Sequence, residues 1–523
     1  MFIEYSEQFY MAYERSKNAI RNIKFGAIEK AVSILLPFVV RTIFIRTLGA
    51  EYSGLNSLFA SILTVLNLTE LGFNTAITYN LYKPIANDDT LTINALLYYY
   101  RKVYRYVGLI ILVLGLLVVP FLSHFIKDSY PADINLTLVY LVFLLDTVLS
   151  YFLFAYYRSL LFAFQRNDVL NRINVLVAVV HRSLQILILL TVRNYYVFIL
   201  TMPVFTLLGN FATATVAKRM LPKYHPEGQI SKELHANIRE KVSGLVVTSV
   251  CVVSRNAFDS IFVSMFLGLV DTTMYNNYYY IMNSIIAVMI VPASSIMAGL
   301  GNSVAVETPE KNYRDMNRLN FAYMWVSGWF TVCLLCLYQP FMKIWMGEAL
   351  MFPFSVVVLF CLYFYVLKMG DIRGLYVEAT GIWWEQRFRS IAEAVANLVL
   401  NYLLGKYYGV YGIIAATLIS LFLINFCYGS TIIFRHYFKG QRIREYFGSN
   451  ALYATVTAVI AVVTLWLCSL VHLGDFAVLV VRMLICTLVP NALYYLFYRH
   501  TKQYRESVPW IMERLKMKRR ASS

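Results

Sequence analysis

Apolar stretches long enough to cross a bilayer recur along almost the whole chain, and short polar segments separate them. A membrane-spanning helix needs about 20 mostly apolar residues. Backbone groups in hydrocarbon must be hydrogen-bonded within their own segment, and no period-two alternation is visible, so the stretches predict helices. The sequence therefore predicts an all-α integral membrane protein with about fourteen transmembrane helices, at 24–48, 54–80, 103–126, 134–162, 169–192, 195–217, 243–268, 274–300, 318–343, 354–373, 388–405, 409–434, 450–471 and 476–498.

The longest inner loop between predicted spans carries Pro222, Pro226 and Gly228. It separates six spans from eight, which predicts two six-helix lobes followed by a C-terminal helix pair. The expected parts are a cytoplasmic amphipathic lead-in at 1–22, an N-lobe at 23–217, a cytoplasmic linker at 218–242, a C-lobe at 243–435, a helix pair at 436–500 and a basic cytoplasmic tail at 501–523.

A short pattern near the end of the first predicted span returns near the end of the seventh. Leu48-Gly49 and Leu267-Gly268 are each preceded by an Ile-Phe pair and followed, a few residues later, by Leu55-Asn56 and Tyr275-Asn276. Each copy predicts a helix end, a tight outer turn and a new helix. Both spans enter from the inside, so the repeat is parallel, and parallel repeats typically bind substrate between halves and work by alternating access.

Charge fixes the expected orientation. With the N-terminus inside, 35 of the 46 Lys and Arg residues fall on the inner side, four in outer loops and seven within spans. This bias predicts that both termini are cytoplasmic and that the number of spans is even. The basic inner segments then account for most of the net charge of +17. A nucleic-acid-binding domain is not indicated, because the basic residues are dispersed along the chain rather than gathered in one region.

The sequence carries little sign of enzyme or cofactor chemistry. It lacks an ATP-binding loop of the G-x-x-x-x-G-K-[ST] type, and its outer loops are short. All seven cysteines fall in apolar segments, and Cys333 and Cys336, although spaced as a CxxC, are interpreted as packing residues. We expect neither a disulfide framework, nor a metal site, nor catalysis.

Basic residues inside the predicted spans are the most informative feature. A charge at bilayer depth costs at least about 2.5–3.5 kcal/mol, so it should face protein or water. Arg41, Arg182 and Arg255 lie in spans 1, 5 and 7, and several buried cations together predict a cavity for an anion. Lys368 and Arg373 on span 10 are candidates for an anionic vestibule. Snorkelling to the interface remains an alternative for Arg41, and a solvated helix end for Lys368 and Arg373.

Acidic residues in the spans are candidates for ion coupling or switching. Asp259 lies four residues after Arg255 on one helix face, where it forms either a structural pair or a switch. Asp146 stands in a strongly apolar segment, and Glu70 lies in span 2. A lone intramembrane carboxylate either couples transport to H⁺ or Na⁺ or makes a hydrogen bond between helices.

The stretch RTIFIRTLGAEYSGLNSLF at 41–59, followed by LTELGF at 68–73, resembles the opening of the bacterial polysaccharide flippases. Their superfamily also contains multidrug extruders and lipid II flippases. The resemblance implies translocation of undecaprenyl-pyrophosphate-linked oligosaccharide from the inner to the outer leaflet, through a cationic cavity. It also implies membrane lipids as surroundings, with a polysaccharide polymerase and glycosyltransferases as partners. Arg41 is similar in position to an arginine in the first helix of the lipid II flippases.

Three rival functions remain. A multidrug exporter of the same superfamily would handle cations and should have an acid-lined cavity. A lipid II flippase would differ only in substrate. A membrane polymerase or glycosyltransferase would place its catalytic residues in a sizeable outer loop, which this chain lacks.

Overall fold

The protein is described here from a computed structural model that covers residues 2–67, 73–127, 130–235, 238 and 257–522. Within these ranges every regular element is a helix. Nine of the described helices are long and apolar enough to cross a membrane, or ten if the bent pair formed by Leu136–Phe152 and Tyr156–Ala163 is one span. The all-α, multi-pass membrane class predicted from the sequence is confirmed.

The number of candidate spans is lower than fourteen for identifiable reasons. Predicted spans 2 and 7 include residues outside the described ranges, and predicted span 8, at 274–300, is not among the candidate spans. Predicted spans 11 and 12 merge into one 54-residue stretch, Trp383–His436. Within that stretch Gly409 has φ 58° and ψ −136°, which no helix tolerates, so the backbone breaks where the two spans were predicted to meet.

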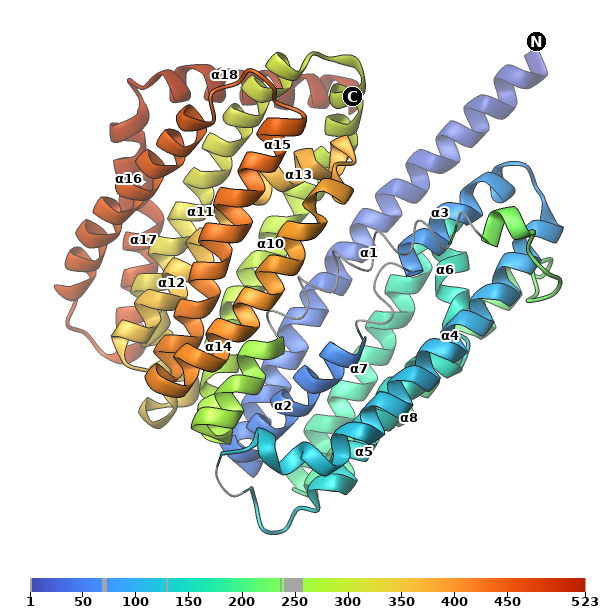
Figure 1. The fold of residues 1–523 in the computed structure, drawn as a ribbon, viewed down its shortest axis with the longest axis horizontal. Coiled ribbons are helices and arrows are strands. Elements are labelled where there is room, and N and C mark those ends of the chain that lie inside the picture. The colour runs from blue at the N-terminus through green and yellow to red at the C-terminus, as the bar shows by residue number, and fades with distance from the viewer. Residues whose placement is uncertain (1, 68–72, 128–129, 236–237, 239–256, 523) are drawn as a thin grey trace. The chain divides into compact units, whose positions relative to one another are not determined.

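The chain forms two compact units, Met1–Thr273 and Met274–Ser523 (Figure 1). The first unit contains α1 (Phe2–Leu48), α2 (Ala50–Leu66), α3 (Phe73–Ala86), α4 (Thr90–Val118), η2 (Val119–Phe125), α5 (Leu136–Phe152), α6 (Tyr156–Ala163), α7 (Asn167–Thr191), α8 (Tyr195–Met220), the short helix Ala257–Leu267 and the start of α10 (Leu269–Val306). The second contains the rest of α10, α11 (Pro309–Met346), η3 (Glu348–Leu350), α12 (Phe354–Met369), α13 (Asp371–Thr380), α14 (Trp383–Ile419), the π-helix η4 (Ser420–Tyr428), α15 (Gly429–His436), α16 (Ile443–Ser469), α17 (Asp475–Tyr498) and α18 (Lys502–Ser522).

Polar side chains start several helices of the first unit. Asn135 and Asn194 accept hydrogen bonds from the backbone N–H groups of Leu138 and Val197, at 3.0 and 3.1 Å. These contacts satisfy backbone donors that the first turn of a helix leaves open, so they fix where α5 and α8 begin.

The two related glycine turns predicted from the sequence are present. Gly49 follows α1 with φ 109°, and Gly268 follows the helix Ala257–Leu267 with φ 104°. Residues other than glycine rarely adopt such positive φ angles. Glycine therefore allows each helix to end and the next to begin without a loop.

These two turns pack against each other and set the boundary of the first unit. The Thr273 hydroxyl donates to the carbonyl of Ala50 at 2.6 Å. A Cβ atom at Gly54 would lie 2.0 Å from the carbonyl oxygen of Leu269, so the backbones touch there. Residues 257–273 therefore belong to the first unit, although the sequence assigned 243–435 to the C-lobe.

A buried carboxylate on α7 forms a contact that joins α7 to α1. Asp168 is fully buried and accepts from Arg21 Nη2 at 2.7 Å and from Arg166 Nε at 3.0 Å. Arg172 lies over the Phe25 ring at 4.0 Å from its centroid. These contacts fix the start of α7, whose later turns carry the candidate site. The predicted lead-in at 1–22 is part of the same continuous helix α1.

In the second unit the C-terminal pair α16 and α17 packs against α11. Pro490 has no N–H to offer to the Cys486 carbonyl one turn earlier. Trp329 Nε1 from α11 donates to that carbonyl instead, at 2.8 Å. The basic tail is helical in its described part, and α18 crosses the end of the bundle beside α11 (Figure 1).

Candidate functional site

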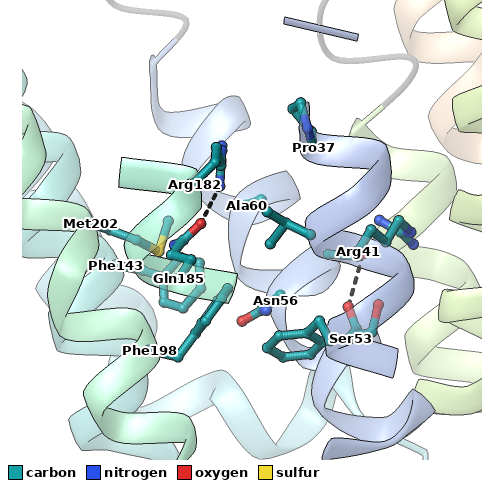
Figure 2. A pocket seen from close by; sticks show the side chains of 13 residues that line it. Pro37, Arg41, Ser53, Asn56, Ala60, Phe143, Arg182, Gln185, Phe198 and Met202 are labelled. Atoms are coloured by element: carbon teal, nitrogen blue, oxygen red, sulfur yellow. Dashed lines mark hydrogen bonds between the residues drawn. The ribbon is translucent and has the colours of Figure 1, made fainter. Parts of the chain in front are cut away.

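A cavity of about 250 Å³ lies inside the first unit, between α1, α2, α5, α7 and α8. Arg41 from α1 and Arg182 from α7 both line it, together with Asn56 and Gln185 (Figure 2). The structure thus brings together two of the five residues that the sequence predicted for anion binding.

A side-chain amide helps to orient Arg182. Arg182 Nη1 donates to Gln185 Oε1 at 2.7 Å, as the dashed line in Figure 2 shows. Gln185 Nε2 in turn donates to the Thr201 hydroxyl at 3.2 Å, and His181 Nε2 lies 2.9 Å from the same hydroxyl. This amide contact orients the guanidinium without cancelling its positive charge.

Aromatic rings form one wall of the cavity. The Phe44 ring lies 4.8 Å from that of Phe198 and 6.1 Å from that of Tyr195, centroid to centroid. The Tyr195 hydroxyl donates to Asn56 Oδ1 at 2.7 Å. Arg46, two residues after the cavity-lining Phe44 on α1, is exposed and does not line the cavity.

Two further cavities continue from the first along α7. A cavity of about 320 Å³ shares Arg182 with the first. A third, of about 530 Å³, shares Arg158 and Asn174 with the second. We call this row the polar track. Its main polar lining residues are Arg41, Asn56, Arg158, Asn167, Asn171, Asn174, His181, Arg182 and Gln185.

The charge of the polar track has one sign. Arg41, Arg158 and Arg182 line its three cavities, and no Asp or Glu is among the described residues that do so. A cavity lined this way attracts anions and repels cations, because its low-dielectric walls strengthen the interaction.

Asp146 lies behind the wall of the track rather than in it. Its Oδ1 accepts a hydrogen bond of 2.5 Å from Thr206, and Thr206 lines the second cavity. Asp259 is fully buried elsewhere in the first unit. Arg255 and Glu70 lie outside the described residues, so the expected pairing of Arg255 with Asp259 stays a prediction.

Lys368 and Arg373 are both in the second unit, and both are buried rather than solvated, with 3% and 4% exposure. Lys368 Nζ lies 2.7 Å from Asp371 Oδ2, to which Tyr323 also donates. An ion pair inside the protein therefore occupies the Lys368 ammonium.

Arg373 holds the π-helix η4. Its Nη1 donates to the Asn425 carbonyl at 2.6 Å and to the Phe426 carbonyl at 3.3 Å, and Nη2 donates to Asn425 Oδ1 at 3.1 Å. A π-helix shifts the backbone register and exposes carbonyl groups that a side-chain donor can use. These protein acceptors take up the guanidinium donors that an anion would need.

Sequence reasoning missed a second buried arginine beside Arg373. Arg389 Nη1 pairs with Glu393 Oε2 at 2.7 Å, and Asn425 Nδ2 donates to the same oxygen at 2.9 Å. The i, i+4 spacing of Arg389 and Glu393 was a readable signal for this pair. We call Lys368, Asp371, Arg373, Arg389, Glu393 and Asn425 the charged network of the second unit.

Comparison with known proteins identifies the fold. No protein-family model matches the sequence, and no curated protein matches it. Among solved structures, the lipid II flippase MurJ in an inward closed conformation aligns with a TM-score of 0.66 and 16% identity, over 91% of this chain and 99% of that one.

Two multidrug transporter structures share the same fold. An inward-facing MATE family transporter of the MOP superfamily aligns with a TM-score of 0.60 and 13% identity, over 78% of this chain and 98% of that one. A variant of the Vibrio cholerae MATE transporter VcmN aligns at 0.56 and 12%, over 81% and 99%. At such identities the likeness establishes the fold, which is that of transporters and flippases rather than of enzymes.

Proposed function

We propose that this protein is a flippase for a lipid-linked oligosaccharide, in which pyrophosphate joins the sugars to a polyprenyl chain. It lies in a bacterial cytoplasmic membrane with both termini inside, and moves the polar headgroup from the inner to the outer leaflet by alternating access. The observation that carries the proposal is the polar track, where Arg41, Arg158 and Arg182 line three cavities that share lining residues, without a described carboxylate.

The chemistry of the track suits both parts of such a headgroup. Guanidinium groups bind phosphate oxygens through paired, charge-assisted hydrogen bonds. The amides of Asn167, Asn171 and Asn174 both donate and accept, which suits sugar hydroxyl groups. The row runs along one helix face, so an elongated headgroup meets the same kind of partner at successive turns.

Two alternatives come from the proteins that share the fold. A multidrug exporter requires a cavity for cations, and three arginines in the track disfavour it. A lipid II flippase is favoured by the structural likeness to MurJ. Since lipid II also carries a pyrophosphate and sugars, the arginines serve either substrate, and the amides of the track are the residues that discriminate between sugars.

Coupling is assigned to Asp146. Its position behind the wall lets protonation or Na⁺ binding act on the Thr206 contact and so on the shape of the second cavity. Partner proteins follow from the substrate: glycosyltransferases supply it on the inner face, and a polymerase consumes it on the outer face.

The test is a flipping assay in proteoliposomes with three labelled substrates: a polyprenyl-pyrophosphate oligosaccharide, lipid II and a lipophilic cation. We expect the wild type to flip a pyrophosphate-linked substrate and the double variant Arg41→Ala/Arg182→Ala to lose this activity. Arg46→Ala is the matched control, because Arg46 is on α1 but exposed. Transport of the cation alone, undiminished in the double variant, would overturn the proposal.

A further inference from the structure

Three cysteines that are far apart in the sequence meet inside the second unit. Cys336 on α11, Cys468 on α16 and Cys486 on α17 have sulfur atoms that all lie within 4.8 Å of one another. All three side chains are at most 1% exposed. The CxxC partner of Cys336, Cys333, is not part of this group, so the sequence spacing gave no sign of it.

The separation of the sulfurs suits a shared metal ion. A metal–sulfur bond of about 2.3 Å places the three sulfurs of a trigonal site about 4 Å apart. The sulfur–sulfur distances in the structure are at most 4.8 Å, so they need to shorten only slightly to bind one ion. The six described cysteines are free thiols, so the three sulfurs are available as ligands.

A cation beside the cluster offsets the charge that thiolate ligands would bring. Arg482 lies one turn before Cys486 on α17, within electrostatic range of Cys468. Its Nε is buried and has no hydrogen-bond partner among the described residues. A buried donor atom without a partner favours a negative group nearby, and a thiolate–metal centre is one.

A contact to the backbone positions one of the three ligands. Cys336 and Cys486 each lie four residues before a proline, Pro340 and Pro490, so neither carbonyl receives its usual intrahelical hydrogen bond. Trp329 Nε1 donates to the Cys486 carbonyl at 2.8 Å, and this contact ties α17 to α11 beside the cluster. The turn that carries Cys486 is thus held by the fold.

We infer that Cys336, Cys468 and Cys486 form a binding site for a thiophilic monovalent d¹⁰ cation of the Cu(I) type, balanced by Arg482. Two thiols lose their protons to water and bind as thiolates, while the third remains a neutral ligand. Two thiolates and one Cu(I) leave one negative charge, which the Arg482 charge cancels. Soft sulfur ligands select Cu(I) over hard cations, and the bound ion links α11, α16 and α17.

A route for the ion exists at the end of α16. Cys468 lies in the last turn of that helix, and the residues that follow it, Ser469 and Leu470, are exposed. A small opening of this turn gives the cluster access to solvent without unfolding the bundle.

The experiment uses the full-length protein in detergent, reduced with a phosphine and titrated with Cu(I) against a chromophoric Cu(I) chelator. We expect one Cu(I) per chain to be withheld from the chelator. Cys468→Ser and Cys486→Ser should lose this binding. Arg482→Gln should weaken it about 10–100-fold, as loss of an outer-shell partner usually does. Cys361→Ala is the control, since Cys361 is buried on α12 outside the cluster and should leave binding unchanged.

A second measurement, made on the wild type, tests the site even if the cysteine variants fail to fold. Cu(I) should protect the three cluster cysteines from a membrane-permeant maleimide, read peptide by peptide by mass spectrometry, while labelling of Cys333 and Cys427 stays the same. Equal retention of Cu(I) by the wild type and the cluster variants overturns the site. So does a disulfide between cluster cysteines that forms whether or not Cu(I) is present.

Discussion

The two units hold basic residues at membrane depth in opposite ways. In the first unit Arg41 and Arg182 line a cavity, and Arg182 donates to a neutral amide. In the second, Lys368 and Arg389 pair with carboxylates, and Arg373 donates to backbone carbonyls of a π-helix. Four of these residues, Arg41, Arg182, Lys368 and Arg373, were predicted from the sequence on the same ground, as basic residues of apolar segments.

The difference shows what separates a ligand-binding arginine from a structural one. A buried cation needs acceptors, and the protein can supply them itself or leave space for a ligand to do so. In the charged network of the second unit the protein supplies them. In the polar track Arg41 and Arg182 line a cavity in which a substrate anion can contact them.

The largest effect should come from breaking the charged network of the second unit. Replacing Glu393 with Gln leaves Arg389 without its carboxylate partner in a buried setting. Losing one partner of a buried ion pair costs about 3–5 kcal/mol, so we expect the free energy of unfolding to fall by that amount. Unfolding in mixed micelles, followed by circular dichroism, measures it.

The matched control is an exposed pair in the same unit. Arg442 and Glu445 lie 3.5 Å apart with side chains that are 83% and 62% exposed. Glu445→Gln should leave the free energy of unfolding unchanged, because exposed pairs are solvated with or without a partner. A similar loss in both variants would mean that the network is not what stabilises the second unit.

The next effect concerns transport rather than stability. Arg182→Ala removes a charge-assisted hydrogen bond to the substrate, worth about 1.5–3 kcal/mol. A tenfold change in rate corresponds to about 1.36 kcal/mol, so flipping should fall about 10–150-fold. Initial rates in proteoliposomes measure this loss.

Two observations accompany that prediction. Arg182→Lys should retain part of the rate, because the charge stays while the paired geometry is lost. The unfolding midpoint of Arg182→Ala should match that of the wild type. A destabilised Arg182→Ala with normal flipping would place Arg182 with the structural arginines of the second unit instead.

Much of the fold was predictable, because bilayer physics leaves few choices. Stretches of about 20 apolar residues must be helices, and glycine at Gly49 and Gly268 marked both turns correctly. The division of the structure after Thr273 was not predictable, because contacts between those two turns, such as Thr273 with Ala50, are long-range and leave no local signal in the sequence.

The candidate site was predictable only in part. Single arginines in apolar runs stood out, but the amide residues of α7 did not. Asn167, Asn171 and Asn174 recur at helical spacing with His181 and Gln185, so these polar residues share one helix face. The pattern was visible in the sequence, but it was missed because uncharged polar residues do not interrupt a predicted span.

Arg158 was hidden for a different reason. It lies on α6, which bends by 49° from α5, and Phe154 at the break has φ 63° although no proline or glycine announces it. In the sequence Arg158 falls at the inner end of the predicted span 134–162, so it was counted with the inner loops. In the structure it lines two cavities of the polar track.

A smaller effect should follow from Asp146→Asn. The amide keeps an acceptor for the Thr206 hydroxyl but cannot take up a proton or hold Na⁺ as a carboxylate does. We expect flipping to lose its dependence on the ion gradient, while the rate without a gradient changes only severalfold. Rates measured with imposed pH and Na⁺ gradients test this, and an unaltered dependence would leave Asp146 as a helix-packing residue.

The smallest effect should come from Arg46, and it sharpens the comparison most. Arg46 is on the same helix as Arg41, five residues on, and differs from it mainly in being exposed. An exposed arginine near a helix end is solvated before and after a substrate arrives, so Arg46→Ala should change both stability and flipping by less than about 0.5 kcal/mol. The same rate assay, run beside Arg41→Ala, decides the matter. A loss at Arg46 as large as that at Arg41 would show that net positive charge, rather than position in the polar track, drives transport.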